Sequence, residues 1–483
     1  MPEHCRSAVP SLAIVNGKVW SRPDATAVAV DGDRIAAIGT GRFEAGHVVD
    51  AGGAWILPAF NDAHVHFLMA SRALGQLDLF GADTQPEVEK RIAEYARSAD
   101  GDWILGRGWF YSAFPGGMPT VELLDRLVPD RPAYLESFDA HTGWANSRAL
   151  AIAGAPHAGI LKEEEILAVT RRLPARTVAE DLDALRAGLR VAASRGVASV
   201  QEAGDGLDQL PLWRALRESD ELTVRVRLAF DMTPGLEIQE WGRRLDDYEA
   251  ARQDRDQWIS TGILKAFADG VVESKTAALL VPYAGTDERG APLWARDELR
   301  EATRIADTRG WQVQVHAIGD AAIRQALDAF EGATPGRRHR VEHIEQPDPA
   351  DIPRFARLGV VASMQPQHAD PDLTEVWRRH LGPERSAHGW PWREILRSGA
   401  RVAFGTDWPV VPLDPFASLE MATRQLSRAE AVAAWTSGSA YAEHAEREKG
   451  ELREGMLADI AVVDFEGARV RATIVGGAVV YEG

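Results

Sequence analysis

His64 and His66 stand two residues apart in the segment PAFNDAHVHF. Side chains at this spacing point to the same side of an extended segment, so the two imidazoles could bind one metal ion. The chain has 13 histidines among 483 residues, and such a pair also arises readily by chance. The position of the pair, directly after a predicted strand, makes a metal-binding role more specific than the spacing alone.

Four further residues with metal-binding or proton-transfer chemistry lie at the ends of predicted strands. They are Lys265 in GILKAFADG, His316 in WQVQVH, His343 in HRVEHI and Asp407 after RVAFGT. Each alone is compatible with a structural role, since a histidine can be satisfied in the core and a carboxylate can anchor a turn. Neutral imidazoles at the ends of adjacent parallel strands can nevertheless meet at one ion, because neighbouring strands lie about 4.8 Å apart.

Lys265 has apolar neighbours on both sides, and an ammonium group is costly to bury. It could pair with Asp269 or extend its amine into solvent. Alternatively, burial lowers its pKa, the neutral amine captures carbon dioxide, and the resulting carbamate bridges two metal ions as a carboxylate would.

The elements that must position these residues are short apolar segments, mostly separated by helical patterns. We predict eight strands, at 55–60, 198–203, 224–230, 262–267, 311–316, 339–344, 360–366 and 401–406. This alternation predicts an α/β fold in which parallel strands close into a TIM-type (β/α)8 barrel. Active sites of such barrels lie at the carboxyl ends of the strands, and the six candidate residues share that rim.

Both ends of the chain show short apolar runs joined by glycine turns, which is typical of β-structure. We predict one composite β-sandwich from residues 1–54 and 450–483, and the barrel over 55–449. The interval between the first two predicted strands is too long for one βα unit, so we expect an insertion at 67–197 that serves as a lid or pocket wall.

The composition limits the partners. With 54 basic and 72 acidic residues the net charge is −18, which disfavours nucleic acid and anionic membranes. The single cysteine cannot form an intramolecular disulfide, and no apolar stretch reaches the roughly 18 residues of a membrane span. The first residues are too acidic, and their apolar run too short, for a secretory signal. We expect a cytoplasmic protein acting on a small molecule, with a homodimer as the default assembly.

Taken in order, several motifs resemble the amidohydrolase superfamily, and within it the YtcJ-like branch of amidohydrolase family 3; the chain is also similar to N-substituted formamide deformylases. The match covers nearly the whole chain, through NGKVW, DGDRIAAIG, PAFNDAHVHF, AHTGWANSRALAIAG, ILKAFADG, TAALLVPYAG, VHAIGD, RVEHIEQ, SMQPQH, FGTDWPV and GMLADIAVVD. The resemblance implies a distorted barrel capped by the composite sandwich, a binuclear metal centre, and hydrolysis of a carbon–nitrogen bond in an amide-like substrate.

Carried over by position, the resemblance implies that His64, His66 and Asp407 bind the more buried ion, that carboxylated Lys265 bridges, and that the second ion is bound by two histidines, His316 and His343. A water bridging the two ions would ionise near neutral pH, and Asp407 would act as general base and then as general acid. Imidazole and carboxylate ligands suggest Zn²⁺, with Mn²⁺, Co²⁺, Ni²⁺ or Fe²⁺ as alternatives.

The segment after the lysine strand departs from the family pattern. Relatives often have a Gly-Ser-x-Gly-Ser-Arg type turn there, whereas this chain has GVVESKTAALL, with Glu273 and Lys275. Both residues could alter the pocket, and this leaves the substrate open.

Other residues suggest substrate contacts. His141 falls on the insertion motif and could contact substrate or simply pack in a loop. Trp109, Trp144 and Trp408 suggest an aromatic or bulky apolar substrate, although tryptophans are more often part of a core.

Three other functions are considered: a one-metal deaminase of the same superfamily, an esterase or lactonase, and an inactive barrel scaffold. Lys265, and the lack of an acid directly after His316, oppose the deaminase. The complete set of six candidate ligands opposes the scaffold.

Overall fold

The structure is a computed structural model, and it describes residues 10–41, 43–155, 159–252 and 256–483. A sheet of eight parallel strands lies at its centre, in the order β19-β18-β17-β16-β15-β14-β13-β7. These strands are β7 (Phe60–Val65), β13 (Val197–Glu202), β14 (Arg225–Asp231), β15 (Ile259–Phe267), β16 (Gln312–Ala317), β17 (Arg340–His343), β18 (Val361–Met364) and β19 (Arg401–Phe404).

The two edge strands of this sheet come together. Just beyond β19, the amide of Asp407 donates to the carbonyl of His64 at 2.7 Å, and the amide of Thr406 donates to the carboxylate of Asp62 at 3.0 Å. The sheet therefore nearly closes into a barrel, and the predicted fold class is confirmed.

Our prediction that residues 55–60 form the first barrel strand is wrong. The strand β6 (Trp55–Pro58) pairs antiparallel with β20 (Ile460–Asp464) in a separate sheet, and the barrel begins with β7 at Phe60. An apolar run has the same pattern in a sandwich strand and in a barrel strand. Our prediction therefore combined the end of the sandwich with the start of the barrel in one strand. His64 consequently lies inside the first barrel strand, and His66 follows it directly.

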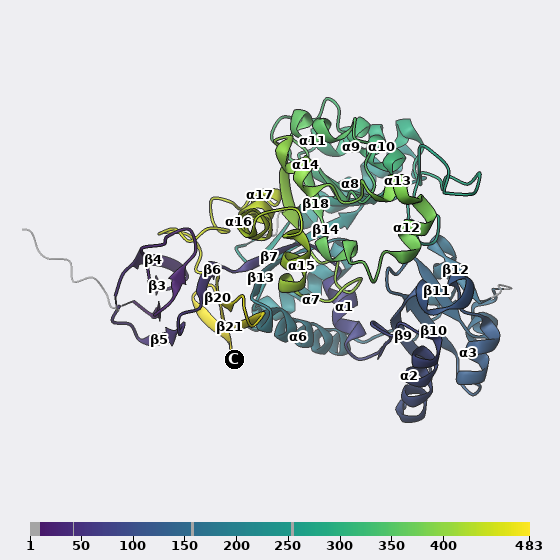
Figure 1. Ribbon diagram of the computed structural model, residues 1–483, viewed down its shortest axis with the longest axis horizontal. Helices are drawn as coiled ribbons and strands as arrows, with labels where there is room; N and C mark the ends of the chain where they lie inside the picture. Colours follow the sequence, from purple (N-terminus) through teal and green to yellow (C-terminus); the bar gives the residue numbers. More distant parts are fainter. Residues whose placement is uncertain (1–9, 42, 156–158, 253–255) are drawn as a thin grey trace, which may run out of the picture.

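Helices surround the barrel on the outside (Figure 1). They are α6 (Val178–Ser194), α7 (Gly206–Glu218), α8 (Ile238–Arg252), α9 (Arg296–Thr308), α10 (Asp320–Ala329), α11 (Ile352–Leu358), α12 (Glu375–Leu381), α13 (Pro383–Ser386), α14 (Trp392–Arg397), α15 (Pro415–Ala422), α16 (Arg428–Ala433) and α17 (Ser439–Ala442). An apolar stripe of each longer helix packs on the strands; in α9 it contains Leu299, Ala302 and Ala306. Across the described ranges, no helix has the length and apolar character needed to cross a membrane.

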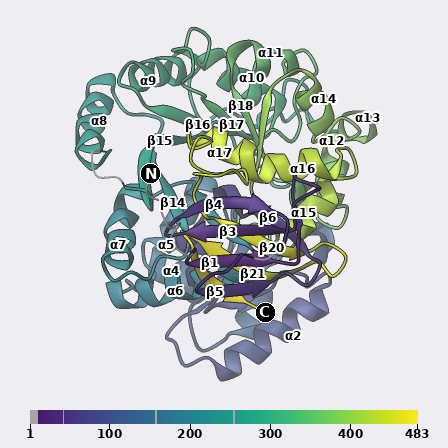
Figure 2. The ribbon, with the colours of Figure 1, turned by 90° about the vertical axis from the view of Figure 1, so that its left-hand side faces the viewer.

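The two ends of the chain build two further sheets that face each other (Figure 2). One has the order β4-β3-β1-β5 and the other β2-β6-β20-β21-β22. Their strands are β1 (Leu12–Val15), β2 (Lys18–Val19), β3 (Ala27–Asp31), β4 (Arg34–Gly39), β5 (His47–Asp50), β21 (Arg469–Val475) and β22 (Ala478–Glu482), beside β6 and β20. Ile14 of the first sheet and Ile56 and Val462 of the second belong to one apolar core.

A long insertion separates β7 from β13. It contains α1 (Phe67–Ala73), α2 (Gln85–Ser98), α3 (Val121–Leu127), α4 (Ser147–Ala153), α5 (Leu167–Thr170) and a sheet in the order β12-β11-β10-β9-β8. The strands of this sheet are β8 (Leu77–Asp78), β9 (Ile104–Trp109), β10 (Ala133–Ser137), β11 (Thr142–Ala145) and β12 (Ile160–Lys162). Figure 1 places the insertion sheet at the opposite end of the molecule from the sandwich.

Candidate metal centre

Three side chains from distant parts of the chain form the centre of the candidate site. Ligand atoms of His64, His343 and Asp407 all lie within 4.8 Å of one another, and all three residues are buried. The Nε2 atoms of His64 and His66 each lie 3.5 Å from Oδ1 of Asp407, and Nδ1 of His343 lies 3.7 Å from its Oδ2.

The remaining predicted ligands lie against this group. Nζ of Lys265 is 3.4 Å from Nε2 of His64, and the ring of His316 is centred 4.4 Å from that of His343. The structure therefore brings all six predicted ligands to one end of the barrel. The backbone of His343 and Asp407 adopts positive φ, a conformation that non-glycine residues rarely take and that tends to occur at functional sites.

The unsatisfied polar atoms of this group fit a metal ion. Within the described ranges, both ring nitrogens of His343 and Oδ1 of Asp407 are buried without a hydrogen-bond partner. Leaving such an atom unpaired costs about 1–3 kcal/mol. A cation that accepts nitrogen and oxygen ligands, as Zn²⁺ does, would satisfy Oδ1 of Asp407 and one ring nitrogen of His343.

The protonation states also fit metal binding. Burial, with a contribution from the charge of Lys265, lowers the pKa of His64 far below its usual value and that of His66 to about 3. Burial likewise lowers the pKa of His316 and His343. These imidazoles are neutral at physiological pH, which is the form that binds metals. Burial lowers the pKa of Lys265 to about 8, which increases the share of neutral amine.

His64 is oriented by a buried carboxylate that we did not predict. Nδ1 of His64 lies 2.6 Å from Oε2 of Glu342, and both side chains are fully buried. Arg340 donates to Glu342 at 2.8 Å, and it also donates to Gln201 and to Ser363. A signal was present in RVEHI, since two charged residues two apart in a parallel strand both point into the barrel.

Two buried aspartates act on the backbone of the site. Asp62 accepts hydrogen bonds from the Thr406 hydroxyl at 2.6 Å and from the His64 amide at 3.1 Å. Asp269 accepts from the amides of Ala278, Ile318 and Gly319, at 2.8, 3.0 and 2.9 Å. These hydrogen bonds fix the backbone of the segments around His316. Among the described residues, Asp269 forms no ion pair with Lys265.

A small, partly open pocket of about 30 Å³ lies beside the candidate ligands. His141 and Glu273 line it, as do His316, His343 and Asp407. The structure thus places His141 and Glu273 beside the candidate ligands, and their contact with substrate stays a prediction. Lys275 instead points toward Glu288, with 3.6 Å between its Nζ and Oε2.

The three tryptophans are placed differently from our expectation of substrate contacts. Trp109 and Trp144 are fully buried in the core of the insertion, and their indole N–H groups donate to the carbonyls of Leu135 and Thr120. Trp408 packs on Phe67, with ring centroids 5.5 Å apart, and lines a separate cavity. The rings of Trp109 and Trp144 thus fill the apolar core of the insertion.

His368 is a pocket residue that we did not predict. Its ring stacks on that of His343, at 5.9 Å between centroids and 9° between planes. Its Nδ1 lies 3.5 Å from Oε1 of Glu345, and its Nε2 lies 3.9 Å from Oδ2 of Asp407. The motif SMQPQH carries the signal, because His368 closely follows the seventh barrel strand.

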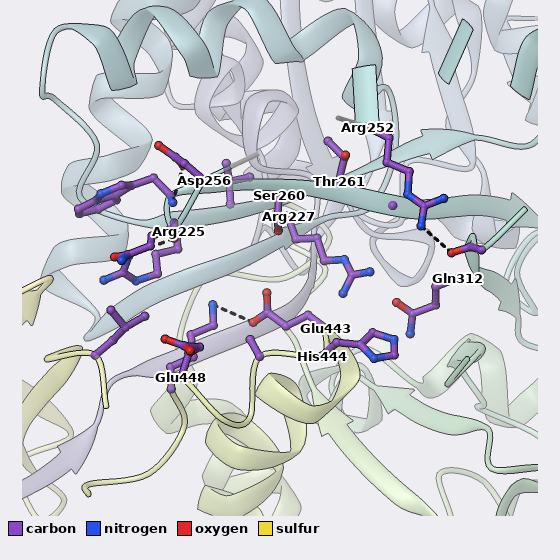
Figure 3. Close-up of a pocket in the computed structure, with 18 of the residues that line it drawn as sticks. Arg225, Arg227, Arg252, Asp256, Ser260, Thr261, Gln312, Glu443, His444 and Glu448 are labelled. Atoms are coloured by element: carbon purple, nitrogen blue, oxygen red, sulfur yellow. Dashed lines mark hydrogen bonds and ion pairs between the residues drawn. The ribbon is translucent and has the colours of Figure 1, made fainter. Parts of the chain in front are cut away.

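A larger cavity lies elsewhere, near the amino-terminal ends of barrel strands (Figure 3). It measures about 810 Å³, and side chains of β14 and β15 face Glu443 and His444 across it. Its charged groups pair with one another or with neighbouring residues: Arg225 with Asp459 at 2.7 Å, and Lys449 with Glu443 at 2.8 Å. None of the six candidate ligands lines this cavity, so its size does not make it the active site.

Comparison with known proteins places the chain in a family. The model of the amidohydrolase family matches residues 47–481. The chain belongs to the amidohydrolase family. The predicted family is thereby confirmed, and the protein is a hydrolase of this family.

Individual relatives agree with this assignment. The chain is similar to the amidohydrolase YtcJ of Bacillus subtilis, with 26% identity over 90% of each chain. It is similar to an N-substituted formamide deformylase of Arthrobacter pascens, with 25% identity over 94% of this chain and 93% of the relative. A metal-dependent hydrolase from Pyrococcus furiosus has a similar structure, with a TM-score of 0.73, 26% identity and coverage of 94% and 99%.

Proposed function

We propose that this amidohydrolase uses two divalent metal ions to hydrolyse a carbon–nitrogen bond in a small amide-like substrate. The observation that carries the proposal is the convergence of six potential ligands around buried nitrogen and oxygen atoms that have no partner among the described residues. His64, His66 and Asp407 would hold one ion, His316 and His343 the other, and Lys265, as a carbamate, would bridge them.

When bound, Zn²⁺ or a similar ion would lower the pKa of a bound water so that it ionises near neutral pH, and the ion would also polarise the substrate carbonyl. Asp407 would accept the proton of the attacking hydroxide on a carboxylate oxygen and deliver it to the leaving nitrogen. Burial raises the pKa of Asp407 to about 6 without a metal, and a bound cation would lower it by favouring the carboxylate. Glu342 holds the His64 ring by accepting from Nδ1, so that Nε2 faces the ion.

The pocket walls include apolar side chains. Phe138, Ile318, Leu373 and Val410 give it apolar surface, which would contact an aromatic or bulky apolar part of the substrate. Because Trp109 and Trp144 belong to the core of the insertion, the case for an aromatic group rests on these four residues. Cytoplasmic location, a homodimer and the lack of nucleic-acid or membrane partners stay predictions from the sequence.

The test combines metal analysis with a substrate screen. We expect close to two equivalents of metal per chain by elemental mass spectrometry, and hydrolysis of an amide from a panel of N-substituted formamides, N-acyl arylamines and cyclic imides. The panel also contains esters, lactones and amino-heterocycles, whose preferred turnover would replace the amide assignment. Well under one equivalent of metal, with no gain on reconstitution, would favour an inactive scaffold.

A further inference from the structure

Three carboxylates line the same pocket as the candidate metal ligands, in addition to Asp407. They are Asp139 of the insertion, Glu273 after β15, and Glu345 after β17. Three separate parts of the chain therefore contribute acidic groups to one small enclosure.

Asp139 has an oxygen that is ready to accept a hydrogen bond. Its Oδ1 accepts from the hydroxyls of Ser137 and Tyr111 and from the amide of His141. Its Oδ2 is buried and has no partner within the described ranges, and the residue is only 7% exposed. A buried acceptor without a donor is costly, so a bound molecule with a donor group would satisfy it.

The basic groups around the pocket already have partners. Nδ1 of His141 lies 2.8 Å from Oε2 of Glu163, and His368 faces Glu345 and Asp407. Arg107 donates to the carbonyls of Phe138 and Pro409. Within the described ranges, neither Asp139 nor Glu273 forms an ion pair.

The neighbouring carboxylates affect the pKa of Glu273. Burial, and next the charges of Glu345 and Asp139, raise its pKa well above the usual value. A positive group entering between these carboxylates would relieve both the desolvation and the repulsion.

We propose that the substrate carries a primary ammonium or guanidinium group, and that Asp139 and Glu273 bind it. This inference rests on the proposed amide hydrolysis, since it assumes that the adjacent metal centre holds the scissile bond. Apolar residues that line the same pocket, such as Phe138 and Ile318, would contact the linker that joins the cation to the amide. The pocket would thus select a substrate with an apolar middle and a cationic end.

The test uses matched probes that differ only in charge. One pair is N-acetyl-1,4-diaminobutane and N-pentylacetamide, with the cation on the amine side of the amide. The other is 4-aminobutanamide and pentanamide, with the cation on the acyl side. Binding to the metal-loaded protein is measured by calorimetry, and hydrolysis is measured as kcat/KM for each probe.

We expect the charged member of at least one pair to bind at least tenfold more tightly, with a similar preference in kcat/KM where turnover occurs. Glu273→Gln should reduce this preference at least fivefold, while Glu288→Gln, the same change at an exposed residue, should preserve it. Asp139→Asn supplies a second variant, with thermal unfolding to check that it folds.

The outcomes separate this inference from the proposed function. Charge-selective binding without any hydrolysis would support the cation site and count against amide hydrolysis. Hydrolysis with equal or better use of the neutral probes would leave the enzyme assignment intact and overturn the cation site. An unchanged preference in Glu273→Gln, or no binding of any probe, would overturn it as well.

Discussion

The Nδ1 atom of His64 lies 2.6 Å from Oε2 of Glu342, and both side chains are fully buried inside the barrel. The bond joins β7 to β17, which lie far apart both in the sequence and in the order of the sheet. It fixes which ring nitrogen of His64 faces the candidate metal site.

Glu342→Gln should lower metal affinity about 10–100-fold, because an amide accepts from Nδ1 more weakly than a carboxylate. Chelator competition on the purified protein measures this affinity. Glutamine keeps a partner for Arg340, so thermal unfolding should show a folded protein. Unchanged metal affinity in a folded variant would remove Glu342 from the metal site.

Asp407→Asn should leave metal binding largely intact while lowering kcat by about 10²–10⁴-fold, since the amide can bind an ion but cannot take up the proton. Metal content and steady-state kinetics are measured on the same preparation. Asp372→Asn, an exposed change at the same end of the barrel, is the control. Near-normal turnover in Asp407→Asn would refute its role in proton transfer.

Lys265→Met should lower the metal content below two equivalents, because the side chain keeps its bulk but cannot form a carbamate. In the wild type, loading in the presence of ¹³C-bicarbonate should give a carbamate signal by NMR that is absent from the variant. A short carboxylate such as propionate should restore part of the activity. If the wild type shows no labelled carbamate at full metal content, Lys265 acts in another way.

The half-buried pair of His141 and Glu163 should make stability depend on alkaline pH. Burial alone would lower the pKa of His141, but the charge and hydrogen bond of Glu163 outweigh it and raise the pKa from 6.5 to about 9. The folded state therefore binds the proton more tightly than the unfolded state. The stabilisation is complete below pH 6.5 and is lost as the pH rises through 9.

Denaturant unfolding of the wild type and of His141→Gln at pH 6.5 and 9.5 tests this dependence. The advantage of the wild type should shrink with rising pH, by on the order of 3 kcal/mol at most. Glu163→Gln should show the same convergence with the wild type, because it removes the other half of the pair. An advantage that grows with pH would contradict the assigned sign.

Much of the fold follows from patterns that are local in the chain. Alternating apolar runs and helical stretches predict a barrel, and glycine turns at both ends predict a shared β-sandwich. The sequence misplaces the first strand because the apolar run from Trp55 to Phe60 contains all of β6 and the first residue of β7. Only pairing with β20 or β13 distinguishes the two strands, and that pairing is a long-range property.

The sequence by itself determined which residues could bind metal, because imidazole, amine and carboxylate chemistry belongs to residue types and the strand ends follow from local patterns. Only the tertiary structure decided where Glu342, His368 and Asp139 lie relative to the candidate ligands. Their roles depend on contacts between distant segments and on burial, which changes pKa values and makes an unpaired oxygen costly. Burial likewise placed Trp109 and Trp144 in a core, although their sequence context was equally compatible with a pocket.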